Sequence, residues 1–173
     1  KHIMRYQQMF ASFAIKQKLS EGVKSGIIWH TQGSGKTALA FYNVKHLTDY
    51  YASLPNPIVP KFYFIVDRID LLTQAKIEFE ERGLTVNTVN DRDELMNQFR
   101  SQTSIFNQQG KLEITVVNIQ KFKEDQHKVK MDEYAINLQR ISFLDEAHRG
   151  YKPDGCFLAN LFDSDRNSIK IAL

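Results

Sequence analysis

The chain has 173 residues, of which 42% are hydrophobic and 25% charged, and its formal net charge is +3. These values are typical of one globular domain, and they exclude two large domains as well as a largely disordered chain. No apolar run approaches the roughly 18 residues that cross a bilayer, and the single cysteine, Cys156, cannot form an internal disulfide. We therefore expect no membrane partner and a reducing compartment, the cytoplasm.

Helical and strand patterns alternate along the chain. Cap residues and apolar side chains at helical spacing predict helices over residues 3–20, 36–51, 71–82 and 91–106. Short apolar runs predict strands over residues 25–30, 61–67, 84–89, 112–118, 141–145 and 168–173. The alternation predicts an α/β domain with a parallel sheet and helices on both faces. Because no element follows the last run to cover it, we expect the chain to be a fragment of a longer protein.

A glycine-bearing loop, residues 30–37, joins the first predicted strand to the second predicted helix. Its glycines let backbone N–H groups turn toward an anion, and the helix N-terminus adds a partial positive charge. Lys36 would reach the β- and γ-phosphates of a nucleotide, and Thr37 would ligate Mg²⁺. The P-loop pattern G-x-x-x-x-G-K-[ST] has a glycine where this chain has His30, and the alternative is a glycine-rich turn with a surface lysine. The loop residues expected to bind nucleotide are Gln32, Gly33, Ser34, Gly35, Lys36 and Thr37.

A second motif begins where the predicted strand over 141–145 ends, with two carboxylates in succession, Asp145 and Glu146. An aspartate at the tip of a buried strand can hold Mg²⁺ through its water shell beside a P-loop. Glu146 would orient or deprotonate the attacking water. The alternative is a solvated Asp-Glu pair. The order of Lys36 before Asp145, each after a strand of one α/β domain, favours nucleotide binding.

Four segments carry a family resemblance: residues 28–37, 66–71, 118–122 and 144–149. The last contains Asp-Glu-Ala-His, and the set resembles the first RecA-like motor domain of superfamily 2 DEAH-box helicases and translocases. The wording Trp-His-Thr-Gln-Gly-Ser-Gly-Lys, with His30 in the first position of the loop, is similar to motif I of the restriction (R) subunit of type I restriction-modification enzymes. Type III restriction subunits share the general pattern but match these segments less well.

The resemblance implies roles for individual residues. Arg5 and Gln8 belong to an upstream segment in which a glutamine reads adenine, so Gln8 is the expected adenine contact; the alternative is an exposed polar residue on a helix. His148 would couple the nucleotide site to the partner domain or to DNA, and the alternative is a capping or surface histidine. The expected catalytic set is Lys36, Asp145, Glu146 and His148. Contacts to the DNA backbone, which fix position without reading sequence, are expected from Arg68, Gln120 and Lys121.

For the whole protein, the resemblance implies a prokaryotic cytoplasmic enzyme that uses ATP and Mg²⁺ to translocate double-stranded DNA before cutting it. Residues 1–173 would form a single ATP-binding domain that closes against a second RecA-like domain, in a complex with modification and specificity subunits. Because the second domain supplies the arginine finger, we expect the isolated chain to hydrolyse ATP poorly. The alternatives are another superfamily 2 helicase or a type III restriction subunit, a P-loop nucleotide switch with no nucleic-acid partner, and a degenerate P-loop module.

Overall fold

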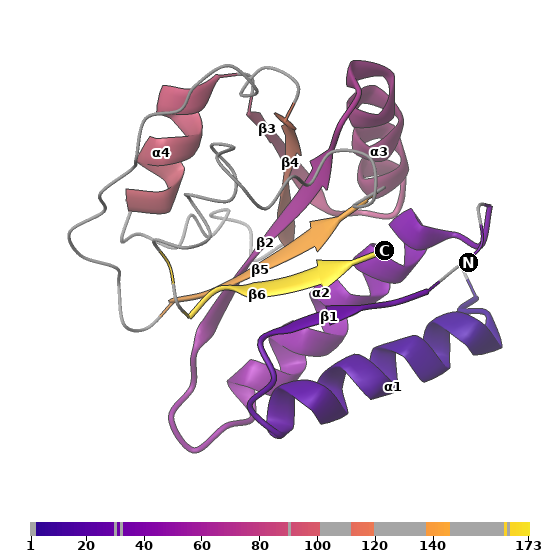
Figure 1. The fold of residues 1–173 in the computed structure, drawn as a ribbon, viewed down its shortest axis with the longest axis vertical. Helices are drawn as coiled ribbons and strands as arrows, with labels where there is room; N and C mark the ends of the chain where they lie inside the picture. The colour runs from indigo at the N-terminus through magenta and orange to yellow at the C-terminus, as the bar shows by residue number, and fades with distance from the viewer. Residues whose placement is uncertain are drawn as a thin grey trace.

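The computed structural model describes residues 3–29, 31, 33–89, 91–100, 112–119, 138–145, 165 and 167–173. In chain order the elements are α1 (Tyr6–Ser20), β1 (Ser25–Ile27), α2 (Lys36–Ala52), β2 (Val59–Val66), α3 (Ile69–Glu81), β3 (Thr85–Val89), α4 (Arg92–Arg100), β4 (Glu113–Asn118), β5 (Leu138–Leu144) and β6 (Ile169–Ala172) (Figure 1). Each predicted element is present within these ranges, while residues 101–106 of the predicted fourth helix lie outside them. No helix in the described ranges is long and apolar enough to cross a membrane.

All the described strands pair in parallel, in the order β1-β6-β5-β2-β4-β3. The predicted parallel sheet is therefore confirmed. Because parallel strands end at the same edge of a sheet, the segments that follow β1, β5 and β2 all begin at one edge. Ligands of open parallel sheets bind beyond this carboxyl edge. Lys36, Asp145 and Arg68 each follow one of these strands.

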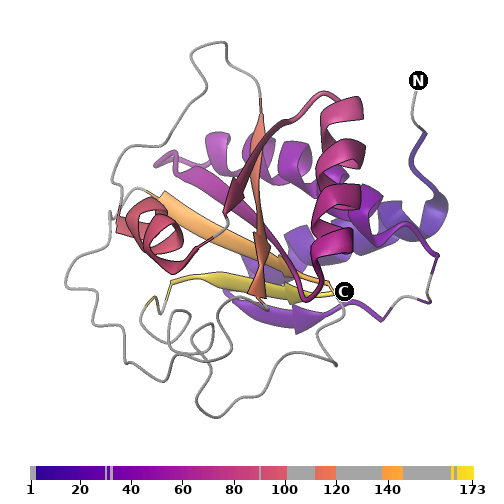
Figure 2. The same ribbon diagram turned by 90° about the horizontal axis from the view of Figure 1, so that it is seen from above.

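One face of the sheet carries the apolar core. Alternate residues of β2, Phe62, Phe64 and Val66, pack with the buried faces of α1, α2 and α3. The Phe64 ring meets that of Phe79 from α3 edge-on, with centroids 5.2 Å apart. Figure 2 shows α4 on the opposite side of the sheet from α3. The prediction of helices on both faces is confirmed, and most of the described apolar burial lies on the side of α1 to α3.

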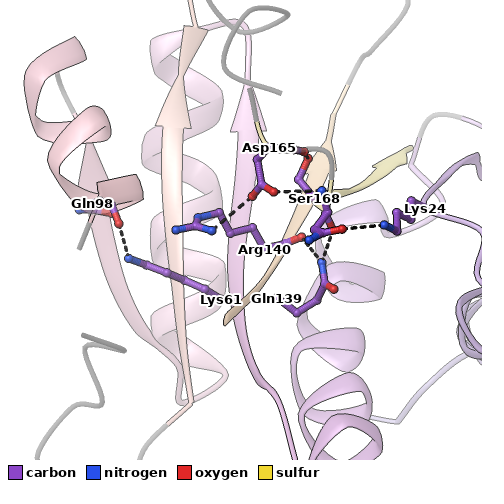
Figure 3. Close-up of polar contacts among 8 residues, drawn as sticks. Lys24, Lys61, Gln98, Gln139, Arg140, Asp165 and Ser168 are labelled. Atoms are coloured by element: carbon purple, nitrogen blue, oxygen red, sulfur yellow. Dashed lines mark hydrogen bonds and ion pairs between the residues drawn. The ribbon is translucent and has the colours of Figure 1, made fainter. Parts of the chain in front are cut away.

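The other face of the sheet is unusually polar (Figure 3). The Lys61 Nζ donates a hydrogen bond of 2.8 Å to the carbonyl oxygen of Gln98 in α4, and Lys61 pairs in register with Arg140 of β5. The Arg140 guanidinium, 2% exposed, forms an ion pair of 3.3 Å with Asp165, which is 4% exposed. Removing one partner of such a buried pair leaves an uncompensated charge, which costs several kcal/mol, of order 3–5. The hydrogen bond of Lys61 and the ion pair of Arg140 therefore tie specific segments to this face of the sheet.

Lys61 gives a testable pH dependence of stability. Burial, and secondly the Arg140 guanidinium, lower the pKa of Lys61 from 10.5 to about 8, against the attraction of Glu113. Between these two values the unfolded chain holds a proton that the folded chain has lost, so the contribution of Lys61 to stability rises with pH from about 8 to 10.5. We expect Lys61→Met to raise the free energy of unfolding at pH 7.5 by about 1–2 kcal/mol, since the lost hydrogen bond to Gln98 offsets part of the gain.

The measurement is urea unfolding of wild type and Lys61→Met at pH 7.5 and pH 9.5. The advantage of the variant shrinks at pH 9.5, because the folded wild type is then largely free of the buried charge. A stability difference that is the same at both pH values would contradict the prediction.

Strand β1 lies at the edge of the sheet and is shorter than predicted, because the strand over residues 25–30 ends at Ile27. Its side chains are exposed, with Ile27 at 73%, and Trp29 beyond it is 90% exposed. An apolar groove of about 330 Å³ lies between the second half of α1 and strands β1 and β6. The strand that leads into the glycine loop thus has neighbours on one side only among the described residues.

Candidate nucleotide-binding site

The glycine loop adopts the backbone conformation that an anion cradle requires. Gly33 and Gly35 have φ values of +77° and +82°, a region that other residues rarely adopt. Gly35 is the N-cap of α2, and no side-chain cap hydrogen bond is present at this helix end among the described residues. The first helical hydrogen bond runs from the Leu39 N–H to the Gly35 carbonyl oxygen at 2.9 Å. The N–H groups of the first turn therefore have no acceptor within the helix and carry its partial positive charge.

Gly35 is needed for a second reason. A Cβ built at this position would lie 2.6 Å from the Gln8 Nε2, which is closer than real Cβ contacts. At Gly33, which has nearly the same φ, a Cβ would meet no described atom within 4 Å. The two glycines of the loop therefore have different roles: both permit the turn, but only Gly35 makes room for another segment of the chain.

The side chains around this helix end fit a magnesium nucleotide. Lys36 and Thr37 are the first two residues of α2 and are half-buried. The Ser34 Oγ is buried and has no hydrogen-bond partner among the described residues. An ammonium group, two hydroxyls and a set of unpaired N–H groups are the donors and ligands that phosphate oxygens and Mg²⁺ take in such loops. Lys36 could hold the phosphates, and Thr37 could ligate the metal ion.

Gln8 contacts the loop directly, although it is 26 residues away from Ser34 in sequence. It is 3% exposed, so the alternative of an exposed helix residue is wrong. Its Nε2 donates to the carbonyl oxygens of Gly35 at 3.2 Å and Ser34 at 3.4 Å, while its Oε1 accepts the Arg5 N–H at 3.0 Å. The Arg5 bond fixes which end of the amide faces the loop. The adenine contact of Gln8 stays a prediction, and its contact with the loop was missed because nothing in the local sequence pattern signals it.

Asp145 follows β5 at the carboxyl edge. Its backbone N–H donates to the Ile65 carbonyl oxygen at 3.0 Å, which continues the pairing of β5 with β2. Strand β6 separates β5 from β1, which leads into the loop. A second aspartate, Asp67, follows the neighbouring strand β2, and its Oδ1 is buried without a partner among the described residues. Sequence reasoning gave no role to Asp67, although it too is an acidic residue just past a predicted strand.

Arg68 occupies the N-cap position of α3 without a side-chain capping bond, and it is about half exposed. Its guanidinium makes two hydrogen bonds to the carboxylate of Asp70, at 3.2 Å and 2.9 Å. Such a bidentate pair orients the side chain and leaves further N–H donors for another anion. The remaining predicted site residues lie outside the described part of the chain: Gln32, Gln120, Lys121, Glu146 and His148.

Ser12 of α1 and Asn43 of α2 are two further buried polar residues near the loop that sequence reasoning missed. Asn43 interrupts the apolar stripe of α2, and Ser12 lies among the buried residues of α1. A polar residue inside an apolar stripe at helical spacing is the signal that could have identified them. Their hydrogen bonds join the two helices just behind the loop.

Comparison with known proteins finds endonuclease subunits of type I restriction enzymes among the relatives of this chain. A chain named as the MjaVIIP endonuclease subunit of a type I restriction enzyme, from Methanocaldococcus jannaschii, is 41% identical over 86 residues, which cover 47% of this chain and 8% of the relative. Endonuclease subunits of the type I restriction enzymes SsaAORF53P, from Staphylococcus saprophyticus, and SauCOLORF180P, from Staphylococcus aureus, are each 29% identical over 150 residues, covering 84% of this chain. This chain spans 14% of the length of these two relatives. The profile of the family described as "Type III restriction enzyme, res subunit" matches residues 1–173, and the chain belongs to this family.

Proposed function

We propose that this chain is the first motor domain of a type I restriction enzyme's R subunit and that it couples ATP hydrolysis to translocation of double-stranded DNA before cleavage. The observation that carries the proposal is the helix end at Gly35: an uncapped α2 N-terminus, two glycines with positive φ and Lys36 at the first helical position. The relatives named above, all type I endonuclease subunits, favour type I over type III for this chain.

The proposal gives each residue of the site a role in ATP hydrolysis. The first-turn N–H groups of α2 and the Lys36 ammonium neutralise phosphate charge that would otherwise oppose nucleophilic attack. Thr37 and Asp145 hold Mg²⁺, which supplies electrostatic stabilisation of the transferred phosphoryl group. Glu146 positions the attacking water, and Gln8 reads the adenine. His148 couples this site to the rest of the motor.

The DNA track lies at the same edge of the sheet. Arg68, Gln120 and Lys121 contact the phosphate backbone, so they fix the motor on the duplex without reading sequence. A second RecA-like domain closes over the nucleotide and supplies the arginine finger. Modification and specificity subunits complete the complex and choose the recognition site, and the enzyme works in the cytoplasm.

The test is ATP hydrolysis by the full-length protein with and without double-stranded DNA, together with displacement of a third strand annealed along the duplex. A motor shows DNA-stimulated hydrolysis and ATP-dependent displacement of the third strand. A nucleotide switch with no nucleic-acid partner would show neither a DNA effect on hydrolysis nor salt-dependent DNA binding. That result would overturn the proposal.

Arg68 gives a quantitative prediction for the DNA contact. If its guanidinium neutralises one phosphate, Arg68→Ala in the full-length protein lowers the slope of log affinity against log salt by about one unit. Arg82→Ala is the matched control, because Arg82 lies at the far end of α3 and pairs with Glu78. We expect the control to keep the wild-type slope. A slope unchanged by Arg68→Ala would remove this residue from the DNA track.

A further inference from the structure

A buried polar chain runs from the middle of α2 to the glycine loop. The Asn43 Nδ2 of α2 donates to the Ser12 Oγ of α1 at 3.1 Å, and the Ser12 Oγ donates to the carbonyl oxygen of Gln8 at 2.9 Å. The Gln8 side chain then holds the Gly35 carbonyl oxygen. Ser12 and Gln8 are each 3% exposed and Asn43 is fully buried. The chain therefore crosses the interior from one helix to the next and ends at the loop.

These polar groups lie in a seam that is otherwise apolar. Ala11 and Ile15 of α1 and Val44 of α2, which neighbour Ser12 and Asn43 along their helices, belong to the buried apolar core. Asn43 also donates to the Leu39 carbonyl oxygen of its own helix at 2.9 Å, but its Oδ1 is buried with no partner among the described residues. A core position that keeps an unsatisfied polar atom is less stable than an apolar one of similar shape, and such positions occur where function requires them.

These buried hydrogen bonds fix one register between helices α1 and α2. Contacts between aliphatic side chains are non-directional, so they tolerate small sliding of one helix along the other. The hydrogen bond between Asn43 and Ser12 has a fixed direction, and the contacts of Gln8 with the loop, at 3.2 and 3.4 Å, are already near the limit of a hydrogen bond. A shift of α1 by about 1 Å would break them. The shape of the loop thus depends on where Ser12 and Asn43 hold α1.

We propose that Ser12 and Asn43 are positioning residues for the nucleotide site: through Gln8 they hold the Gly35 carbonyl, and so the phosphate cradle, in its binding conformation. The inference rests on the proposed function, because it assigns these residues to a site that binds Mg-ATP. It adds two residues whose described hydrogen bonds go to the helices and not to the loop itself, and it assigns them an effect on nucleotide affinity.

The experiment measures binding of Mg-ATP and of Mg-tripolyphosphate by calorimetry, and the melting temperature, for wild type and four variants: Ser12→Ala, Ser12→Thr, Ile15→Val and Lys36→Ala. Ser12→Ala removes the hydroxyl but leaves Asn43 bonded to Leu39, so the fold is retained. We expect both ligands to bind about fivefold more weakly, because the variant loses the hydrogen bond between Asn43 and Ser12 that holds α1, and with it Gln8, in place. Ser12→Thr keeps a hydroxyl that can bond the carbonyl four residues back, and it restores affinity.

Ile15→Val is the matched control, because it loosens the same seam without touching a polar group. It lowers the melting temperature by a few degrees, about 3 °C, and leaves both affinities unchanged. Equal weakening by Ile15→Val would show that affinity merely follows stability and would overturn the proposal. So would wild-type affinity in Ser12→Ala, or a loss confined to ATP, which would place the effect at the adenine.

The two proposals fail in different ways. Wild-type binding that depends on Lys36 but is unchanged by Ser12→Ala overturns the positioning role alone. If the wild type binds neither ligand, or binding survives Lys36→Ala, the proposed nucleotide site is wrong and the positioning role is overturned with it.

Discussion

Gly35→Ala weakens Mg-ATP binding more than Gly33→Ala does. Both substitutions place a Cβ at a positive φ, which costs about 1–2 kcal/mol for a residue other than glycine. At Gly35 the new Cβ also lies 2.6 Å from the Gln8 Nε2, whereas at Gly33 it meets no described atom within 4 Å. The alanine at 35 must therefore displace the end of the Gln8 side chain, which breaks its hydrogen bonds to the carbonyl oxygens of Gly35 and Ser34.

The pair of variants separates backbone strain from the clash with Gln8. The measurement is calorimetry with Mg-ATP, accompanied by thermal unfolding to show that both variants fold. Gly33→Ala is expected to bind about tenfold more weakly than wild type, because a backbone strain of about 1.4 kcal/mol corresponds to a tenfold change in affinity. Equal losses in the two variants would mean that the contact between Gln8 and Gly35 has no part in shaping the cradle.

Asp145→Asn in the full-length protein lowers the DNA-stimulated rate of ATP hydrolysis by about 100-fold, or about 2.7 kcal/mol of activation free energy. The substitution keeps the shape of the side chain but removes the charge that would hold Mg²⁺. Asp145 stands at the end of β5, two places from β1 in the sheet.

Asp67→Asn is the control for Asp145→Asn. Asp67 is the first residue after β2, a strand that lies one place farther from β1 than β5 does, and the same chemical change is made there. We expect hydrolysis to stay within about twofold of wild type in Asp67→Asn, because this carboxylate has no place in the proposed metal site. If the two variants lost the same activity, the metal ligand would have to be reassigned.

The elements were predictable because each leaves a local signal. Apolar runs such as residues 61–67 marked β2, and Gly83 marked the end of α3, which stops at Glu81. The restriction-subunit resemblance is likewise confirmed by the family match over the whole chain. Both kinds of signal depend on residues that are close together in the sequence.

Strand order and the polar face were not predictable in this way. Periodicity does not say which strand lies at an edge, so the exposure of Ile27 in β1 could not be foreseen. Nor did the apolar run that contains Lys61 reveal that its alternate residues face a buried arginine on β5, because that depends on which strands pair. Pairing is decided by contacts between segments almost 80 residues apart.

The candidate site also has a part that local sequence predicts and a part that depends on contacts between distant segments. The glycines, Lys36, Thr37 and Asp145 were predicted from sequence because the chemistry of phosphate and metal binding requires those residue types at those places. The support of the loop by Gln8, Ser12 and Asn43 was not found, since its hydrogen bonds join segments 26 to 31 residues apart. Such support becomes visible only when the helices are placed side by side.

The most direct test of the account is Mg-dependent ATP binding by this chain, measured by calorimetry for wild type, Lys36→Ala and Lys45→Ala. Lys45 is an exposed lysine on the same helix, so its variant controls for the loss of one positive charge. We expect wild type and Lys45→Ala to bind alike and Lys36→Ala to bind at least tenfold more weakly, because a charge-assisted hydrogen bond to phosphate is lost. Binding that survives the loss of Lys36, or no binding by wild type even in the full-length protein, would contradict this expectation.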